Sequence, residues 1–432
     1  MSTPSVSRPS TLSDMALFVL TAAAPPMSYL AAFLFDSQTT LTDSSYNTVI
    51  ITTGNGARNV QVLAMAAALL LCAHLFIRGV RRGLNPWTAL LLPSVLITLC
   101  EFLRGSTDFP GLLGLTVALV VVLTAAVTTV DRRVVRALGL WSVFFLLSIW
   151  VTHFLGLGES SKVCRDDKCS FAGFLLQGYM GHENVLGLYV AFLLPTFAFF
   201  GTRARWSATT LAVLTVLATG SRTAMLSAFI ALVAMLVVRR VWPDPNRPRF
   251  ERQPVLVARV MAVIPAAATL AALLLFLLAP PGALTDRGDI YALLREYVAT
   301  SPLYGPGSNV LDKAYEASKT EWLIPHPHSQ PGYLLVVGGV VTLTAFLVAM
   351  ALLAVTGSRR SSLHVTMFAV APSLSFATED VWSYDFFGSF FWTLALTVAL
   401  YSQAARGQWG DSSVWVDRER EPTAVPIPER SG

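Results

Sequence analysis

The chain has 432 residues, of which 54% are hydrophobic and only 13% are charged, and its mean hydropathy is +0.59. A water-soluble globular protein of this length would need more polar surface, so this balance excludes that class. The formal net charge of +5 does not indicate a nucleic-acid-binding protein, because the basic residues fall in short clusters between long apolar runs. Such clusters are typical of the loops that orient membrane helices.

Apolar runs recur along the whole chain, and a run of about 20 residues can cross the ~30 Å hydrocarbon core of a bilayer. The first run begins at Met15, after a polar segment rich in Ser and Pro. It is long enough to remain as a span, so no cleaved signal peptide is expected. We predict an all-α, polytopic membrane bundle of about twelve transmembrane helices. The expected spans are 14–35, 60–77, 87–103, 109–130, 138–155, 184–201, 207–220, 222–238, 260–279, 331–355, 363–377 and 386–403.

The distribution of Lys and Arg orients this bundle. With the N-terminus in the cytoplasm, most basic residues fall inside, including the clusters at 78–82, 132–136 and 239–259. The positive-inside rule therefore predicts that both termini are cytoplasmic. We expect residues 1–403 to form the transmembrane domain and residues 404–432, which are rich in Pro and charge, to form a disordered cytoplasmic tail.

Two external segments, 156–183 and 280–330, are longer than turns require, and long loops in compact domains are often functional. Cys164 and Cys169 both lie in the first of these segments. They could remain free thiols, but an oxidising compartment would let them close a small loop, and we predict a disulfide. A zinc site is not expected from two cysteines without a nearby histidine.

Arginines at the edges of apolar runs are candidate ligands for an anionic substrate. Arg222 stands between two apolar runs, where an unpaired guanidinium costs about 3 kcal/mol or more. It is either an interfacial anchor or a pyrophosphate clamp, because the planar guanidinium binds phosphate oxygens and keeps its proton. Helical spacing of apolar residues in 280–330 predicts an amphipathic helix on the membrane face. Arg287, Tyr291 and Arg295 form a stripe along it, although a solvated face is favoured for Arg295.

A histidine close to the start of an expected span is the candidate base. His328 just precedes the span that begins at Pro331. An unperturbed imidazole takes up a proton near neutral pH, as the activation of a hydroxyl nucleophile requires. A loop histidine without further context is more often inert. His326 is the alternative candidate.

Several short motifs follow one another between about residues 170 and 345. They are Gly181-His182-Glu183-Asn184-Val185-Leu186-Gly187, Ser221-Arg222-Thr223-Ala224, Arg287 opening the external helix, Ser301-Pro302-Leu303-Tyr304-Gly305-Pro306-Gly307, and His328-Ser329 before Gly339. No single motif is specific, but the ordered set resembles the O-antigen ligase superfamily, which includes O-antigen polymerases of the Wzy type. The chain departs from that pattern at Ser329, where Asn is common, and at Val337, where an acidic residue is frequent.

The resemblance implies an all-helical membrane glycosyltransferase. It would transfer a glycan from undecaprenyl pyrophosphate to an acceptor hydroxyl, without a nucleotide, cofactor or metal. Carried over by position, Arg222 and Arg287 would hold the pyrophosphate and His328 would be the base. The further expected substrate contacts are Asn184, Tyr291, Arg295 and His326.

Two classes of function stay open at this point. The first is a glycosyltransferase of the ligase or polymerase type in the plasma membrane of a bacterium. Its partners would be the lipid-linked glycan donor, the bilayer and a glycan, lipid or protein acceptor, and not nucleic acid. The second is a secondary solute transporter, for which an even number of spans with both termini inside is typical. The scarcity of acidic residues within the spans and the external position of the longest loop argue against transport.

Overall fold

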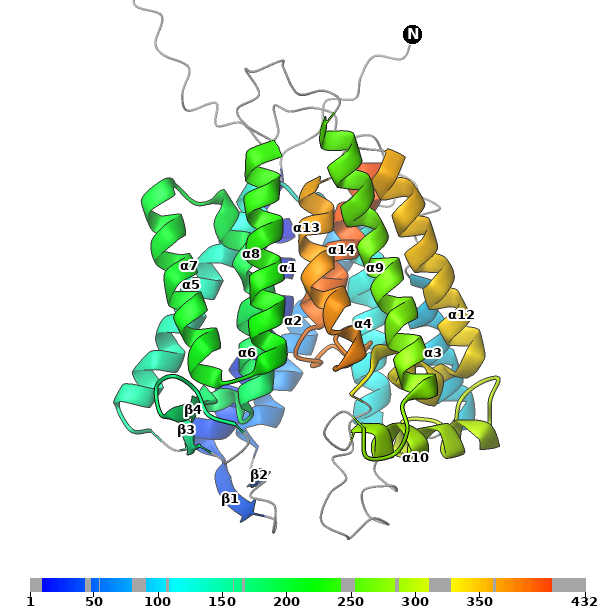
Figure 1. Cartoon of the computed structure of the whole chain (residues 1–432), viewed down its shortest axis with the longest axis horizontal. Coiled ribbons are helices and arrows are strands. Elements are labelled where there is room, and N and C mark those ends of the chain that lie inside the picture. Colours follow the sequence, from blue (N-terminus) through cyan, green and yellow to red (C-terminus); the bar gives the residue numbers. More distant parts are fainter. Residues whose placement is uncertain are drawn as a thin grey trace, which may run out of the picture.

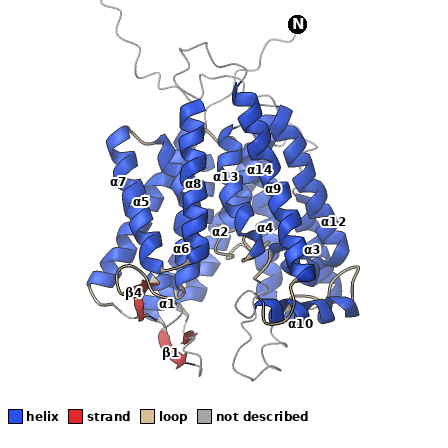
Figure 2. Cartoon of the chain, viewed as in Figure 1, coloured by secondary structure: helices blue, strands red, loops and turns tan. Residues whose placement is uncertain are grey.

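The structure, a computed structural model, describes residues 10–42, 48–53, 55–79, 91–105, 109–157, 159–164, 168–241, 253–283, 287–310, 328–359 and 363–405. Long helices dominate this part of the chain and run side by side in one bundle (Figure 1; Figure 2). They are α1 (Leu12–Phe35), α2 (Gly56–Gly79), α3 (Leu91–Arg104), α4 (Phe109–Val127), α5 (Arg132–Phe154), α6 (Glu183–Leu193), α7 (Thr202–Thr219), α8 (Arg222–Val241), α9 (Gln253–Leu278), α10 (Arg287–Thr300), α12 (Gln330–Arg359), α13 (Leu363–Leu374) and α14 (Phe391–Ala405).

Each expected span coincides with one of the helices of the bundle. The 3₁₀ helices η4 (Leu194–Phe199) and η6 (Ser375–Ala377) continue α6 and α13. The last span starts later than expected, because α14 begins at Phe391 and residues 378–390 form an irregular segment. Helices long and apolar enough to cross a membrane are Leu12–Phe35, Gly56–Arg78, Arg132–Phe154, Arg259–Leu278 and Gln330–Val355. The prediction of a helical membrane bundle is therefore supported, and the count of twelve crossings stays a prediction.

Large apolar side chains cover much of the outside of the bundle. Leu63 and Leu70 of α2 expose 70% and 74% of their surface, and Phe229 of α8 exposes 64%. Water does not favour an apolar surface of this extent, whereas lipid tails are as apolar as these side chains. Helices also satisfy their own backbone hydrogen bonds, as a bilayer requires. Both features are those of a multi-pass membrane protein.

Two short antiparallel hairpins accompany the helices, and the sequence-based prediction named neither. β1 (Ser37–Thr42) pairs with β2 (Thr48–Thr53), and β3 (Ser161–Val163) pairs with β4 (Phe174–Leu176). The first hairpin is rich in threonine, with valine and isoleucine in β2, and β-branched residues favour extended backbone. Both hairpins lie at the end of the bundle that α10 crosses (Figure 1). We call this end the loop end.

Helix α10 lies across the loop end, roughly at right angles to the bundle helices (Figure 1), in keeping with the expected amphipathic helix in 280–330. Its buried residues are Gly288, Tyr291 and Leu294. Residues 311–327 of this segment lie outside the described residues, as do residues 406–432 of the expected tail.

Helix α12 is interrupted at Gly339, where the backbone adopts φ 65° and ψ −164°. The turn Ser301–Gly307 fills the break. The Val340 amide donates to the Pro302 carbonyl at 2.9 Å, and the Gly307 amide donates to the Val336 carbonyl at 2.9 Å. A Cβ atom on Gly339 would collide with the backbone of Leu303. The motif around Ser301–Gly307 and the distant Gly339 are therefore two halves of one structural feature.

Gly339→Ala should destabilise the protein more than Gly105→Ala. Both glycines have positive φ, 65° and 59°, but a Cβ on Gly105 would meet nothing within 4 Å. Each substitution carries the left-handed backbone cost of about 1–2 kcal/mol, and only Gly339→Ala adds a clash with the turn. Thermal unfolding of the purified variants in detergent measures the difference. Equal losses of stability would show that the turn does not pack tightly in the break.

Candidate active site

His328 stands two residues before α12 and has an unusual backbone conformation. Its φ of 45° makes it the one non-glycine residue with positive φ in the part of the chain that the structure describes. Such conformations cost about 1–3 kcal/mol and cluster at functional sites. The imidazole Nδ1 lies 3.5 Å from Oε2 of Glu379. The side chain is mostly buried, with 15% of its surface exposed, so the loop end presents an imidazole beside a carboxylate.

Glu379 brings the predicted arginine and the predicted base together. It follows η6 in the irregular segment before α14, and its carboxylate is buried. Its Oε1 lies 3.6 Å from Nη2 of Arg287, the first residue of α10. Arg287, Glu379 and His328 therefore form one ionic cluster built from three separate segments of the chain, which we call the ionic triad.

The sequence-based analysis did not select Glu379. A signal was present, because Glu379 and Asp380 follow directly after an expected span in a chain with few acidic residues near its apolar runs. Acidic side chains at such positions are costly and are retained where they have partners or a function. What the sequence could not provide was the partner, since His328 is distant in the chain.

Two buried hydrogen-bonding side chains fix the segments that carry His328 and Glu379. The Tyr291 hydroxyl donates to the carbonyls of His328, at 2.9 Å, and Ala377, at 3.0 Å. The Gln330 side chain pairs with the backbone of Trp382, donating to its carbonyl at 3.0 Å and accepting from its amide at 2.7 Å. Both clamps tie the start of α12 to the backbone that flanks Glu379, so the separation of imidazole and carboxylate is constrained on two sides.

The contacts of Tyr291 and Arg295 give both residues a structural part in α10. Tyr291 is fully buried, and burial raises the pKa of its phenol to about 12, so the hydroxyl keeps its proton and can donate. The Arg295 guanidinium donates to the carbonyls of Phe276, at 2.6 Å, and Ala279, at 3.2 Å. It therefore satisfies carbonyls at the C-terminal end of α9. A role for either residue in substrate binding stays a prediction.

A second polar group surrounds the start of α6 at the loop end. The Lys168 ammonium donates to Oε1 of Glu183, at 2.7 Å, and to Oδ1 of Asn184, at 2.8 Å. A disulfide joins Cys164 and Cys169, whose Cα atoms are 4.7 Å apart. Lys168 lies within the loop that this disulfide closes. Asn184, an expected substrate contact, is thus held by a lysine that the sequence-based analysis did not select.

The two polar groups lie within electrostatic reach of one another. His182 caps α6, and its Nδ1 accepts from the Asn184 amide at 3.1 Å. Partial burial lowers the pKa of the His182 imidazole, while Glu183 and also Glu379 favour its protonated form. Glu379, a member of the ionic triad, therefore acts electrostatically on the start of α6.

Arg222 is the first residue of α8 and is exposed at the loop end. The preceding Gly220 has a φ of 63°, and a Cβ there would lie 3.3 Å from the backbone of Cys169. The turn before Arg222 therefore packs directly against the disulfide loop. This contact places the start of α8 beside the disulfide loop that carries Lys168.

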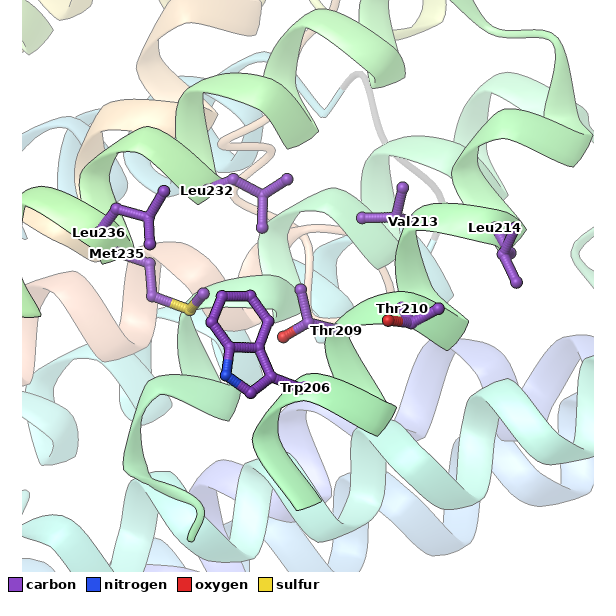
Figure 3. Close-up of a pocket in the computed structure, with 8 residues that line it drawn as sticks. All are labelled: Trp206, Thr209, Thr210, Val213, Leu214, Leu232, Met235 and Leu236. Carbon is purple, nitrogen blue, oxygen red and sulfur yellow. The ribbon is translucent and has the colours of Figure 1, made fainter. Parts of the chain in front are cut away.

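The remaining features add no further chemistry to the site. His326 lies outside the described residues. Within the described ranges, no three His, Cys, Asp or Glu side chains come together as they would around a metal ion. A groove of about 300 Å³ runs between α7 and α8 (Figure 3), and no ionisable side chain lines it. Its lining residues are Trp206, Thr209, Thr210, Val213, Leu214, Leu232, Met235 and Leu236.

The fold and the ionic triad define a multi-pass helical membrane protein with a polar site at one end of its bundle. Residues 207–347 match the family model described as O-antigen ligase. The match contains Arg222, Arg287 and His328, and it confirms the predicted resemblance to the O-antigen ligase superfamily. It supports a membrane enzyme of polysaccharide assembly, of the ligase or polymerase kind, over a solute transporter. No curated protein and no solved structure matches the chain.

Tyr291→Phe should lower the free energy of unfolding by about 1–3 kcal/mol, because it removes the donor from two partly buried carbonyls. Tyr297→Phe, on a half-buried residue of the same helix, is the matched control and should change stability much less. Chemical or thermal unfolding in detergent gives both values. If Tyr291→Phe loses no more stability than Tyr297→Phe, the Tyr291 hydroxyl does not hold the two segments together.

Proposed function

We propose that the protein is a glycosyltransferase that transfers a glycan from a polyprenyl pyrophosphate carrier to an acceptor hydroxyl. The observation that carries this proposal is the ionic triad, in which an imidazole and a guanidinium contact the same buried carboxylate. The family match supports the general class, a membrane enzyme of polysaccharide assembly. The identity of the donor and the reaction are proposed. The chemistry of the triad suits a lipid donor whose leaving group is a pyrophosphate.

In the proposed reaction the acceptor oxygen attacks the anomeric carbon of the donor sugar. The new bond between carbon and acceptor oxygen forms as the bond between carbon and pyrophosphate oxygen breaks, and its electron pair leaves with the polyprenyl pyrophosphate. The acceptor proton passes to Nε2 of His328. Glu379 faces Nδ1 of the same ring, so it orients the imidazole and stabilises the imidazolium that forms, as a carboxylate does in hydrolytic triads.

The pyrophosphate needs cationic groups to bind it and to stabilise the charge that grows on it. Arg287 supports this role because its guanidinium lies in the triad and exposes 22% of its surface. Arg222 supports it as an exposed arginine at the start of α8, beside the turn that packs against the disulfide loop. Arginine suits both positions, since its planar fork can bind two phosphate oxygens. Asn184 is assigned to the donor glycan because it borders the same region.

The proposed location is the plasma membrane of a bacterium, with the loop end outside and both termini in the cytoplasm. The bias of Lys and Arg towards the opposite end of the bundle supports this orientation, and so does the disulfide, because disulfides persist in oxidising compartments. A polyprenyl-linked glycan displayed on the outer side of the membrane would then reach the triad. The product distinguishes the two kinds of enzyme: one transferred glycan defines a ligase, and a growing ladder defines a polymerase.

His328→Asn should lower the rate of glycan transfer by about 10²–10⁴-fold, while binding of polyprenyl pyrophosphate persists. Asparagine suits this test because it tolerates left-handed backbone but cannot act as the base. Transfer and binding are measured on purified variants in detergent or nanodiscs. His326→Asn is the matched control and should retain most activity.

Two outcomes would contradict this assignment. A defect in His326→Asn with normal transfer by His328→Asn would move the base by two residues. Normal transfer by both variants would exclude a transferase that depends on either histidine.

A membrane-impermeant thiol reagent should label Cys164 and Cys169 in intact cells only after reduction, because both belong to a disulfide at the loop end. Cys72 and Cys100 are buried and should stay unlabelled, so they serve as internal controls in single-cysteine variants. Labelling before reduction would exclude the disulfide in cells. Labelling that requires permeabilised cells would reverse the proposed orientation.

A further inference from the structure

The carboxylate of Glu379 contacts the other two members of the ionic triad through different oxygens. Oε1 faces Arg287 at 3.6 Å and Oε2 faces His328 at 3.5 Å. Charge-assisted hydrogen bonds are shorter, at about 2.7–2.9 Å. Both contacts are therefore longer than a charge-assisted hydrogen bond. Because Glu379 is buried, a change in the charge near one oxygen is weakly screened at the other.

The three members of the triad differ in their access to a ligand. Arg287 exposes 22% of its side chain, compared with 15% for His328 and 10% for Glu379. The Tyr291 and Gln330 clamps hold the segments that carry His328 and Glu379, whereas Arg287 begins its helix. An anion that enters from the loop end therefore meets Arg287 as the most accessible of the three.

We propose that Glu379 couples donor binding to activation of the base; this inference rests on the proposed function. In the donor-free protein, Arg287 neutralises part of the Glu379 charge that acts on His328. A pyrophosphate offers Arg287 more negative charge and a bidentate partner, so it displaces Glu379 from the guanidinium. The Glu379 charge, no longer neutralised by Arg287, then acts more strongly on His328 and favours proton transfer from the acceptor hydroxyl.

The coupling has a consequence for the chemical step. His328 is an effective base only when the donor occupies Arg287, so the acceptor hydroxyl is activated only in the donor complex. No covalent bond changes in this handover, because only the ionic partners of Glu379 and Arg287 are exchanged. The polyprenyl pyrophosphate product should occupy Arg287 in the same way until it leaves.

Glu379→Gln tests the coupling through two effects of opposite sign. Polyprenyl pyrophosphate, the probe ligand, should bind about fivefold more tightly, because Arg287 no longer has a competing carboxylate. Transfer should slow by about tenfold or more, because His328 loses its negative partner. Loss of folded protein would weaken both binding and transfer, so it cannot produce this pair of results. Glu296→Gln removes a carboxylate from the exposed face of α10 and should change neither.

The tighter binding must act through Arg287. In an Arg287→Gln background, Glu379→Gln should therefore give no further tightening. Unchanged or weaker binding by Glu379→Gln, or equal tightening in both backgrounds, would overturn the coupling. If Glu379→Gln does not fold, Glu379→Asp provides the same comparison, because it withdraws the charge from both partners. Failure of the wild-type protein to transfer glycan would instead reject the proposed function, while the binding comparison would still report on the coupling.

Discussion

The break in α12 is the constraint on which the loop end depends. A helix in a membrane loses backbone hydrogen bonds at a break, and a bilayer offers no water to replace them. The turn Ser301–Gly307 supplies these partners from outside the helix, with glycine at 305 and 339 allowing the close approach. The same contact ties the segment after α10 to the helix that His328 precedes. The positions of α10 and of the candidate base are therefore linked through backbone packing.

The site itself is assembled from segments that have few local reasons to meet. Arg287 begins α10, His328 precedes α12 and Glu379 follows η6. Tyr291 and Gln330 join their backbones through buried hydrogen bonds, which are costly to leave unmade. These clamps let the carboxylate remain close to both partners without a short bond to either one. A site in which a charge can change partners requires this combination of a fixed backbone and ionic contacts that remain exchangeable.

Much of this organisation could be predicted from the sequence. The apolar runs predicted helices at the places where the bundle has them, because the length and apolarity of a membrane helix are local properties. The ordered motifs predicted the superfamily, and Arg222, Arg287 and His328 were selected as candidate site residues. The two hairpins were missed, since short strands carry weak local signals. Arg295 was selected for its position on a helical stripe, and a stripe does not reveal that its guanidinium donates to carbonyls at the C-terminal end of α9.

The sequence by itself determined that this is a membrane protein, the order of its helices and the types of residue available for acid–base and phosphate chemistry. Only the tertiary structure decided which of these residues meet. Glu379 became part of the site because α13 returns it to the loop end beside α10 and the start of α12. Lys168 reached Asn184 because the disulfide loop lies against α6. A carboxylate acquires its role from the charges around it, and in a helical bundle those charges come from segments that are far apart in the chain.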